Sequence, residues 1–502
     1  MKNNKEMRVG MLLNYLSMAL EGIIIFAFNP FIIRELGQEN YGVYSLMNSF
    51  TGYLSVFEFG LGTTIIRYIS KYNEEKNDTT KESFLSIIFG IYFLIALLII
   101  IVCVILYFSL NNIFSGSLSL EQIKLAKRLF IIISASITLT TIGSVFSAII
   151  SGYEKFIFSR SVVLVTTLLN ALLTLGVLII SPTAELLSMI TLVVSFTSIL
   201  LNSIYVFYKL KIKIKIQKFN NVLFKEIFKF SIFIFIQTLI NQIYWRLDQL
   251  IIGISLTNAA IPLAIYAVAM KINDLTLAFT TVINRYQLPT ITRMVVNKDK
   301  KLTDYLGKIS RFVAILYFAI IIGFIFYGKQ FINIYAGRGY EKAFPIVLII
   351  IISASFSRIH GTGSDVLKAK NEHGMYTLIV FFSALINVIL TVLFIKSYGI
   401  LGAACATAIS VIIGNTFSYY WCLNKKANIN IKKLFKITFK SFPIVIILSI
   451  LFNCLLLFIN SNNIFIYLLK CFLFLIFYLI LIYIFILDEG TKKKIMLKLK
   501  KR

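Results

Sequence analysis

The sequence predicts an all-α integral membrane protein with about fourteen transmembrane helices. Hydrophobic residues make up 58% of the 502 residues and charged residues only 14%, which is far from the composition of a soluble chain. Apolar runs such as residues 87–108 are longer than the about 20 residues that cross a bilayer core. Lys and Arg gather in the short connections between these runs, as they do in multi-pass proteins.

The apolar runs define the expected spans. The N-terminal run follows a basic start, but it contains Glu21 and exceeds the length of a signal peptide, so we interpret it as a retained first helix. The predicted spans are 10–33, 41–66, 83–110, 129–151, 157–181, 186–208, 228–253, 259–285, 312–335, 343–367, 375–397, 400–423, 441–460 and 464–487.

The distribution of basic residues predicts the orientation. Of the 50 Lys and Arg residues, 38 lie on the side of the N-terminus and 8 on the opposite side, in the connections and the adjoining span ends. The other 4, which are Arg246, Lys271, Arg358 and Lys470, lie further inside predicted spans. This asymmetry predicts that both termini face the cytoplasm, since basic loops stay on that side.

We expect two six-helix lobes followed by a terminal helix pair. The most basic connection, after the sixth span, divides the chain and should lie on the anionic inner leaflet. The expected parts are an N-lobe at 1–208, a basic connector at 209–227, a C-lobe at 228–424, the terminal pair at 425–487 and a basic cytoplasmic tail at 488–502.

Several function classes find no support. The net charge of +28 is explained by topology, so we expect no nucleic-acid partner. The five cysteines form no CxxC pair, and we expect neither a disulfide nor a metal site. The stretch from Gly323 to Lys329 fits GxxxxGK, but Gln330 replaces the Ser or Thr of a phosphate loop. We therefore predict no cofactor and no enzymatic activity.

The informative residues are ionisable groups inside predicted spans, because a charge at the bilayer centre costs from about 2.5 kcal/mol and rarely faces lipid. By helical spacing, Glu21 and Glu58 each lie on a polar face of the first and second spans. The tenth span ends in SASFSRIHGTGSDVLK, which is typical of a locally broken helix that lines a cavity. The candidate residues in the later spans are Arg246, Asp248, Lys271, Asp274, Arg358, His360 and Asp365.

Each candidate also has a structural interpretation, and these alternatives stay open. Arg246, Asp248, Lys271 and Asp274 could form interhelical pairs instead of contacting substrate. Glu58 and Asp365 could reach an interface, and His360 could be a packing group instead of a proton relay. In the twelfth span, small residues recur every four positions and predict close helix packing: Gly402, Ala406, Ser410, Gly414 and Ser418.

Three segments carry a resemblance to a known family. The stretch LGQENYGVYSLMNSFTGYLSVFEFGLGTTIIRYISKY, followed later by WRLDQLIIG and YAVAMKI, resembles the Wzx-like polysaccharide-export flippases of the multidrug/oligosaccharidyl-lipid/polysaccharide exporter superfamily. The resemblance extends over the whole chain, including its length and terminal helix pair. It implies a fold like that of the multidrug exporters, with two lobes around a central cavity.

The resemblance also implies a function. Such a protein would move an undecaprenyl-diphosphate-linked oligosaccharide across the bacterial plasma membrane by alternating access, coupled to H⁺ or Na⁺. Its partners would be membrane lipids and glycan polymerase or assembly proteins. We expect Arg246, Lys271 and Arg358 to hold phosphate or acidic sugar. Glu21, Asp248 and Asp274 would then serve pairing or ion coupling, and Glu58, His360 and Asp365 ion coupling or gating.

Other functions compete with this one. A multidrug or cation antiporter of the same architecture should have an acidic and aromatic cavity, whereas Arg246, Lys271 and Arg358 favour an anionic cargo. A membrane glycosyltransferase or glycan polymerase should carry a sizeable extracytoplasmic loop with catalytic residues, which this sequence does not predict. A scaffold for glycan-assembly enzymes would leave the charges within the spans unexplained.

Overall fold

The computed structural model describes residues 2–75, 78–212, 221–285, 287–370, 372–458, 463–487 and 489. All regular secondary structure in these residues is helical, and none of it is a strand. Nine helices among them are long and apolar enough to cross a membrane. The prediction of an all-α, multi-pass membrane protein is therefore confirmed.

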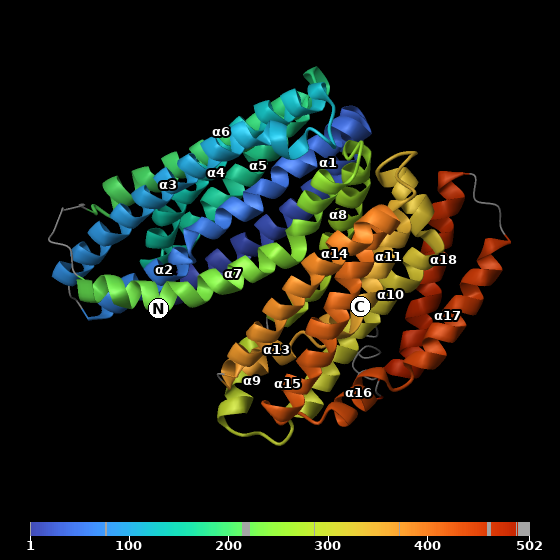
Figure 1. The fold of residues 1–502 in the computed structure, drawn as a ribbon. Helices are drawn as coiled ribbons and strands as arrows, with labels where there is room; N and C mark the ends of the chain where they lie inside the picture. The colour runs from blue at the N-terminus through green and yellow to red at the C-terminus, as the bar shows by residue number, and fades with distance from the viewer. Residues whose placement is uncertain are drawn as a thin grey trace. The chain divides into compact units, whose positions relative to one another are not determined.

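The chain divides into two compact units, and residues 1–267 form the first one together with 395–400. In this unit α4 packs along α6 and α1 packs along α5 (Figure 1). Its elements are α1 (Lys2–Ser55), the 3₁₀ turn η1 (Val56–Glu58), α2 (Leu61–Glu74), α3 (Asp78–Phe114), α4 (Leu120–Gly152), α5 (Phe156–Ile180), α6 (Ala184–Ile204), the π-helical turn η2 (Tyr205–Lys209), α7 (Asn221–Ser255) and the start of α8 (Ala260–Arg285).

The second unit comprises residues 268–394 and 401–502. Its long helix α10 (Leu302–Tyr335) contacts α11 (Ala343–Ser353), α16 (Ile431–Phe439), α17 (Phe442–Leu457) and α18 (Ile464–Leu481). The remaining elements are α9 (Leu288–Val296), α12 (Ser355–Ile359), α13 (Gly363–Ala369), α14 (His373–Ser410), η3 (Val411–Ser418), α15 (Tyr419–Lys425) and η4 (Ile482–Ile486).

The surface of these helices explains why they need a bilayer. Large apolar side chains such as Leu94 and Phe108 of α3 and Ile180 of α5 are more than 60% exposed. A helix that is apolar on its packed side and on its outer side belongs in lipid, where no polar face is required.

Local signals set where the helices begin and bend. A capping box opens α4, because the Ser119 side chain accepts from the Gln122 backbone N–H and the Gln122 side chain accepts from the Ser119 N–H. Gly37 bends α1 and Gly399 bends α14, each with a positive φ that favours glycine. These two bends lie between predicted spans one and two and between spans eleven and twelve, so the expected loops there are kinks.

One predicted span is wrong in detail. We expected an unbroken second span over 41–66, but α1 ends at Ser55 and η1 follows, with Phe59 and Gly60 in the left-handed region. The i+3 and i+4 face that was drawn through Glu58 therefore stops at this break. In contrast, the break predicted in the tenth span is confirmed, since α12 ends at Ile359 and α13 begins at Gly363.

The close-packing prediction for the twelfth span is confirmed. Ala406 and Ser410 are fully buried, and a Cβ added to Gly414 would lie 2.2 Å from Ser383 Oγ. Close contact here is tied to glycine, because the approach leaves no space for a methyl group.

The expected lobe boundaries stay a prediction. The compact units divide at Ala267, within α8, whereas the predicted connector is 209–227. Part of that connector, residues 213–220, and nearly all of the tail at 488–502 lie outside the described residues. The stretch before the thirteenth span, which we expected to be a loop, contains the short amphipathic helix α16.

Candidate functional site

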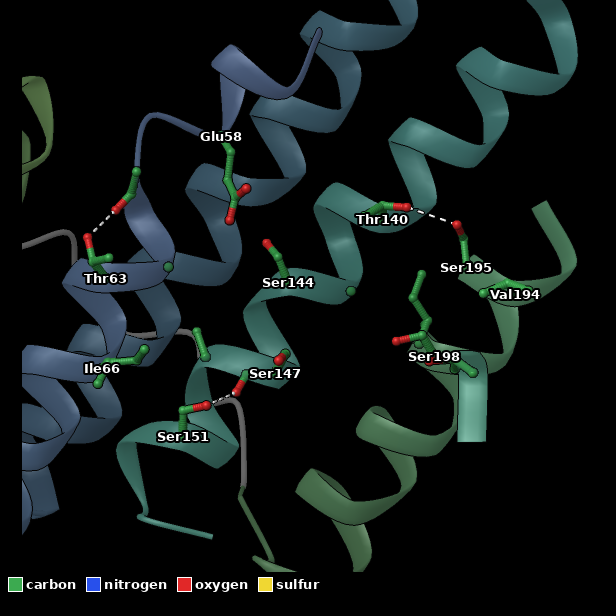
Figure 2. Close-up of a pocket in the computed structure, with 16 residues that line it drawn as sticks. Glu58, Thr63, Ile66, Thr140, Ser144, Ser147, Ser151, Val194, Ser195 and Ser198 are labelled. Atoms are coloured by element: carbon green, nitrogen blue, oxygen red, sulfur yellow. Dashed lines mark hydrogen bonds between the residues drawn. The ribbon is translucent and has the colours of Figure 1, made fainter. Parts of the chain in front are cut away.

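A cavity of about 630 Å³ lies within the first unit, between α2, α4, α5 and α6. Its wall is formed mostly by small and hydroxylated side chains (Figure 2). The hydroxyl residues that line it are Thr63, Thr140, Ser144, Ser147, Ser151, Thr166, Ser195 and Ser198. Such a volume is typical of ligand sites, but a lining so rich in hydroxyls is unusual for a drug-like apolar pocket.

Glu58 is the one charged side chain among the described residues that line this cavity. Its carboxylate accepts a hydrogen bond of 3.4 Å from the hydroxyl of Tyr92, a buried residue of α3. The Ser144 hydroxyl of α4 lies 3.4 Å from that same Tyr92 hydroxyl and points towards Glu58 in Figure 2. The partners of the carboxylate are thus neutral hydroxyl groups.

The break after α1 places Glu58 at the cavity. Phe59 has φ 53° and Gly60 φ 65°, so the chain turns sharply between Glu58 and the start of α2. The Phe59 ring stacks on Phe235 of α7 with ring centroids 4.5 Å apart, which fixes the turn from outside. Gly60 lies against Ile234, where a Cβ would meet the Ile234 side chain at 2.2 Å. A broken helix is tolerated at membrane depth where it lines a cavity.

The hydroxyl side chains of the cavity mostly donate to their own helices. Ser144 donates to the carbonyl of Thr141, and Ser151 to that of Ser147, over 2.8 and 2.9 Å. Thr63, Thr140 and Thr166 each have a backbone carbonyl acceptor of the same kind. Thr63, Thr140, Ser151 and Thr166 therefore present lone pairs to other groups, whereas Ser144 also donates to the Tyr92 hydroxyl.

Glu21 lies elsewhere in this unit. Its side chain is exposed on α1 and accepts a bond of 3.5 Å from Thr167 of α5. It therefore faces α5, whereas Glu58 faces α3 and α4.

The two candidates of α7 point in different directions. Asp248 is 3% exposed and accepts a 2.6 Å hydrogen bond from the hydroxyl of Tyr266, which is 1% exposed. The Arg246 side chain is exposed, and its backbone carbonyl accepts from Tyr53. Arg246 is thus available to a ligand, while Asp248 is buried within the unit.

In the second unit, Arg358 ties three helices together. Its guanidinium donates to Asn273 Oδ1 and Thr276 Oγ1 of α8 at 2.8 Å each and to the Tyr317 hydroxyl of α10 at 3.4 Å. The side chain is 7% exposed. Lys271 and Asp274 are half-buried and flank Asn273 in the same helix.

His360 and Asp365 lie on either side of the break in the tenth span. His360 is 1% exposed; its Nδ1 is 2.6 Å from the Tyr420 hydroxyl and its Nε2 is 3.2 Å from Thr438 of α16. Asp365 lies 3.8 Å from Lys368 in α13. Arg358 contacts α8 and α10 while His360 contacts α15 and α16, so the predicted residues around this break do not converge on one site.

Sequence reasoning found Glu58 but missed the hydroxyl wall opposite it. The signal was present in the fourth span, where Thr140, Ser144, Ser147 and Ser151 recur at helical spacing. This signal is weak in a sequence, because a single Ser or Thr in a membrane helix can donate to a carbonyl of the preceding turn and need not face a cavity.

Comparisons with known proteins cover most of the chain. A sequence model of the family described as polysaccharide biosynthesis protein matches residues 9–295. A protein of Shigella flexneri named as a candidate O-antigen transporter is 23% identical over 410 residues, which cover 80% of this chain and 94% of that protein.

Solved structures share the fold. The lipid II flippase MurJ in an inward closed conformation superposes with a TM-score of 0.71 at 20% identity, over 94% of this chain and 98% of that one. An inward-facing multidrug resistance transporter of the MATE family has a TM-score of 0.64 at 13% identity, over 84% and 99%. The fold is therefore that of a membrane transporter, as the resemblance implied.

Proposed function

Because this chain belongs to the family of polysaccharide biosynthesis proteins, we propose that it is a flippase for a lipid-linked oligosaccharide. It would move the repeat unit of a polysaccharide across the membrane without chemical change. The observation that carries this proposal is a hydroxyl-lined cavity with one carboxylate among membrane helices. Polar and ionisable side chains are energetically costly inside a membrane protein. Those that line a cavity therefore mark the path of a polar substrate.

The proposal extends to the cargo and its surroundings. We place the protein in a bacterial plasma membrane with both termini in the cytoplasm, because basic residues concentrate on that side. The lipid carrier would be undecaprenyl diphosphate, H⁺ or Na⁺ would drive transport, and glycan polymerase or assembly proteins would receive the product. The O-antigen transporter and lipid II flippase named above support a lipid-linked glycan as cargo.

The proposed roles of the charged residues follow their exposure. Arg246 is exposed and Lys271 half-buried, so both suit contact with a diphosphate. Arg358 has all its observed bonds to neutral groups of its own unit, and in this conformation it orders helices. Glu21, Asp248 and Asp274 keep the proposed roles of pairing or ion coupling.

A deletion strain tests the proposed function. Lipid-linked repeat units should accumulate on the cytoplasmic face when the gene is removed, and the wild-type gene should restore export. The double variant Arg246→Gln/Lys271→Gln should fail to restore it, whereas the exposed loop variant Arg338→Gln should succeed. Normal export in the deletion strain would contradict the flippase function. Restoration by the double variant would show that neither residue is needed to hold the diphosphate.

One observation favours a second candidate, a cation antiporter. The cavity carries a carboxylate and no described basic side chain, and the MATE transporter shares the fold. This function predicts altered resistance to cationic drugs in the deletion strain, with no accumulation of lipid-linked glycan.

A further inference from the structure

We propose that the cavity beside Glu58 is a selectivity site that admits uncharged, hydroxyl-rich sugars of the cargo and excludes sugars bearing carboxylate or phosphate groups. This inference rests on the proposed flippase function and deepens it, since it names the chemical class of glycan that the cavity accepts. Three features of the cavity carry it.

The first feature is the polarity of the hydroxyl wall. Thr63, Thr140, Ser151 and Thr166 each donate their proton to a backbone carbonyl three or four residues earlier in the chain, over 2.8 to 2.9 Å. A hydroxyl that has donated its proton still has lone pairs with which to accept. This part of the wall is therefore an array of hydrogen-bond acceptors, and its natural complement is a ligand with many O–H donors, which is a sugar.

The second feature is the uncompensated charge of Glu58. Its hydrogen-bond partner Tyr92 is a neutral hydroxyl, and no Lys or Arg is among the described residues that line the cavity. A carboxylate can accept hydrogen bonds from two sugar hydroxyls. Such charge-assisted hydrogen bonds are stronger than those between two neutral groups. The same carboxylate repels an anionic sugar, and the repulsion is strong where helices exclude water.

The third feature is the space next to the carboxylate. Gly62 lies beside Glu58, and a Cβ there would be 3.3 Å from Glu58 Oε1. Gly143 of α4 faces Ile199 of α6, where a Cβ would come within 2.5 Å of the Ile199 side chain. Gly62 thus keeps one side of the carboxylate open, and Gly143 lets α4 and α6 approach closely at the cavity wall. The diphosphate of the carrier has no cation here, so it must bind elsewhere while the glycan occupies this cavity.

A transport assay with paired cargoes tests the inference. The full-length protein is reconstituted in vesicles with polyprenyl-diphosphate-linked disaccharides that differ only in the second sugar, glucose in one and glucuronic acid in the other. A membrane-impermeant pyrophosphatase cleaves the cargo that reaches the outer leaflet, so detection depends on the shared diphosphate and not on the sugar. The variants are Glu58→Gln and, as a matched control outside this cavity, Glu35→Gln.

The ratio of the two transport rates is the readout. We expect the wild type and Glu35→Gln to move the glucose cargo about tenfold faster than the acidic one, and Glu58→Gln to reduce this ratio to less than about threefold, since the repulsion is lost. Equal wild-type rates for both cargoes, or a ratio unchanged in Glu58→Gln, would overturn the inference. An equal loss of both rates in Glu58→Gln would also overturn it, because the residue would then serve a step common to all cargoes. Wild-type protein that moves neither cargo would instead refute the flippase function itself.

Discussion

Arg358 and Asn273 are joined by a 2.8 Å hydrogen bond from guanidinium Nη2 to amide Oδ1, with both side chains buried. The bond links α12, just before the break in the tenth span, to α8. A buried guanidinium with neutral partners is costly, so the order of the unit depends on keeping its hydrogen bonds.

The first prediction concerns this link. Arg358→Met should lower the free energy of unfolding by roughly 3 kcal/mol, because the buried Asn273 and Thr276 oxygens lose charge-assisted partners. Thermal unfolding of the purified protein in detergent measures the effect, with the exposed Arg338→Met as control. Unchanged stability combined with lost transport would assign Arg358 to the substrate instead.

A second prediction concerns Asp248. Tyr266→Phe removes a 2.6 Å donor from a buried carboxylate and should cost about 1.5–3 kcal/mol. Tyr208→Phe, at an exposed hydroxyl, should change little. Chemical unfolding followed by fluorescence compares the two variants. If the Tyr266→Phe and Tyr208→Phe proteins were equally stable, other groups would satisfy the hydrogen bonding of the Asp248 carboxylate.

A third prediction tests the break in the tenth span. Gly363→Ala adds a methyl group 2.5 Å from the Tyr419 hydroxyl, which donates to the His360 carbonyl over 2.6 Å. Overpacking of this kind should cost about 1–3 kcal/mol. Gly90→Ala, where nothing lies within 4 Å of the added methyl, is the matched control in a thermal unfolding experiment. A Gly363→Ala protein as stable as Gly90→Ala would mean that Tyr419 relaxes without loss.

A fourth prediction concerns the cavity. Ser147→Leu fills space beside Ser144 and Ser151 and keeps the Ser147 backbone carbonyl that accepts from Ser151, so transport of any cargo should slow at unchanged thermal stability. Ser109→Leu, at the surface of α3, should leave the rate as it was. The comparison uses initial transport rates per reconstituted molecule. Normal transport by the Ser147→Leu protein would show that cargo does not pass through the cavity.

The sequence was sufficient for the membrane fold and for one helix break, because these depend on local patterns. The length of an apolar run matches the thickness of the bilayer core, so it predicts a membrane-spanning helix. The polar, glycine-containing end of the tenth span predicts a helix break. The break before Gly60 was missed because Phe59, a bulky residue, adopts the left-handed conformation there. That conformation is held by stacking on Phe235, a contact between residues far apart in the chain.

The partners of the charged residues could not be predicted for a related reason. Helical spacing shows which residues share a face, but not which helix lies opposite. Arg358 and His360 are two residues apart and were grouped together, yet one contacts α8 and the other α16. The packing of the second unit is needed to see that Arg358 links helices through hydrogen bonds, whereas His360 lies in an aromatic cluster.

The helix α16 has a practical consequence for anyone who shortens this protein. Leu434 of α16 is buried in a core that also contains Leu306 of α10 and Leu423 of α15, and Ile437 lies against Gly307. A chain cut before residue 431 would lose the terminal pair and also uncover this apolar core. Failure of such a shortened protein would therefore report a damaged fold, and the role of the terminal pair is better probed by substitutions on α17 and α18 that leave α16 in place.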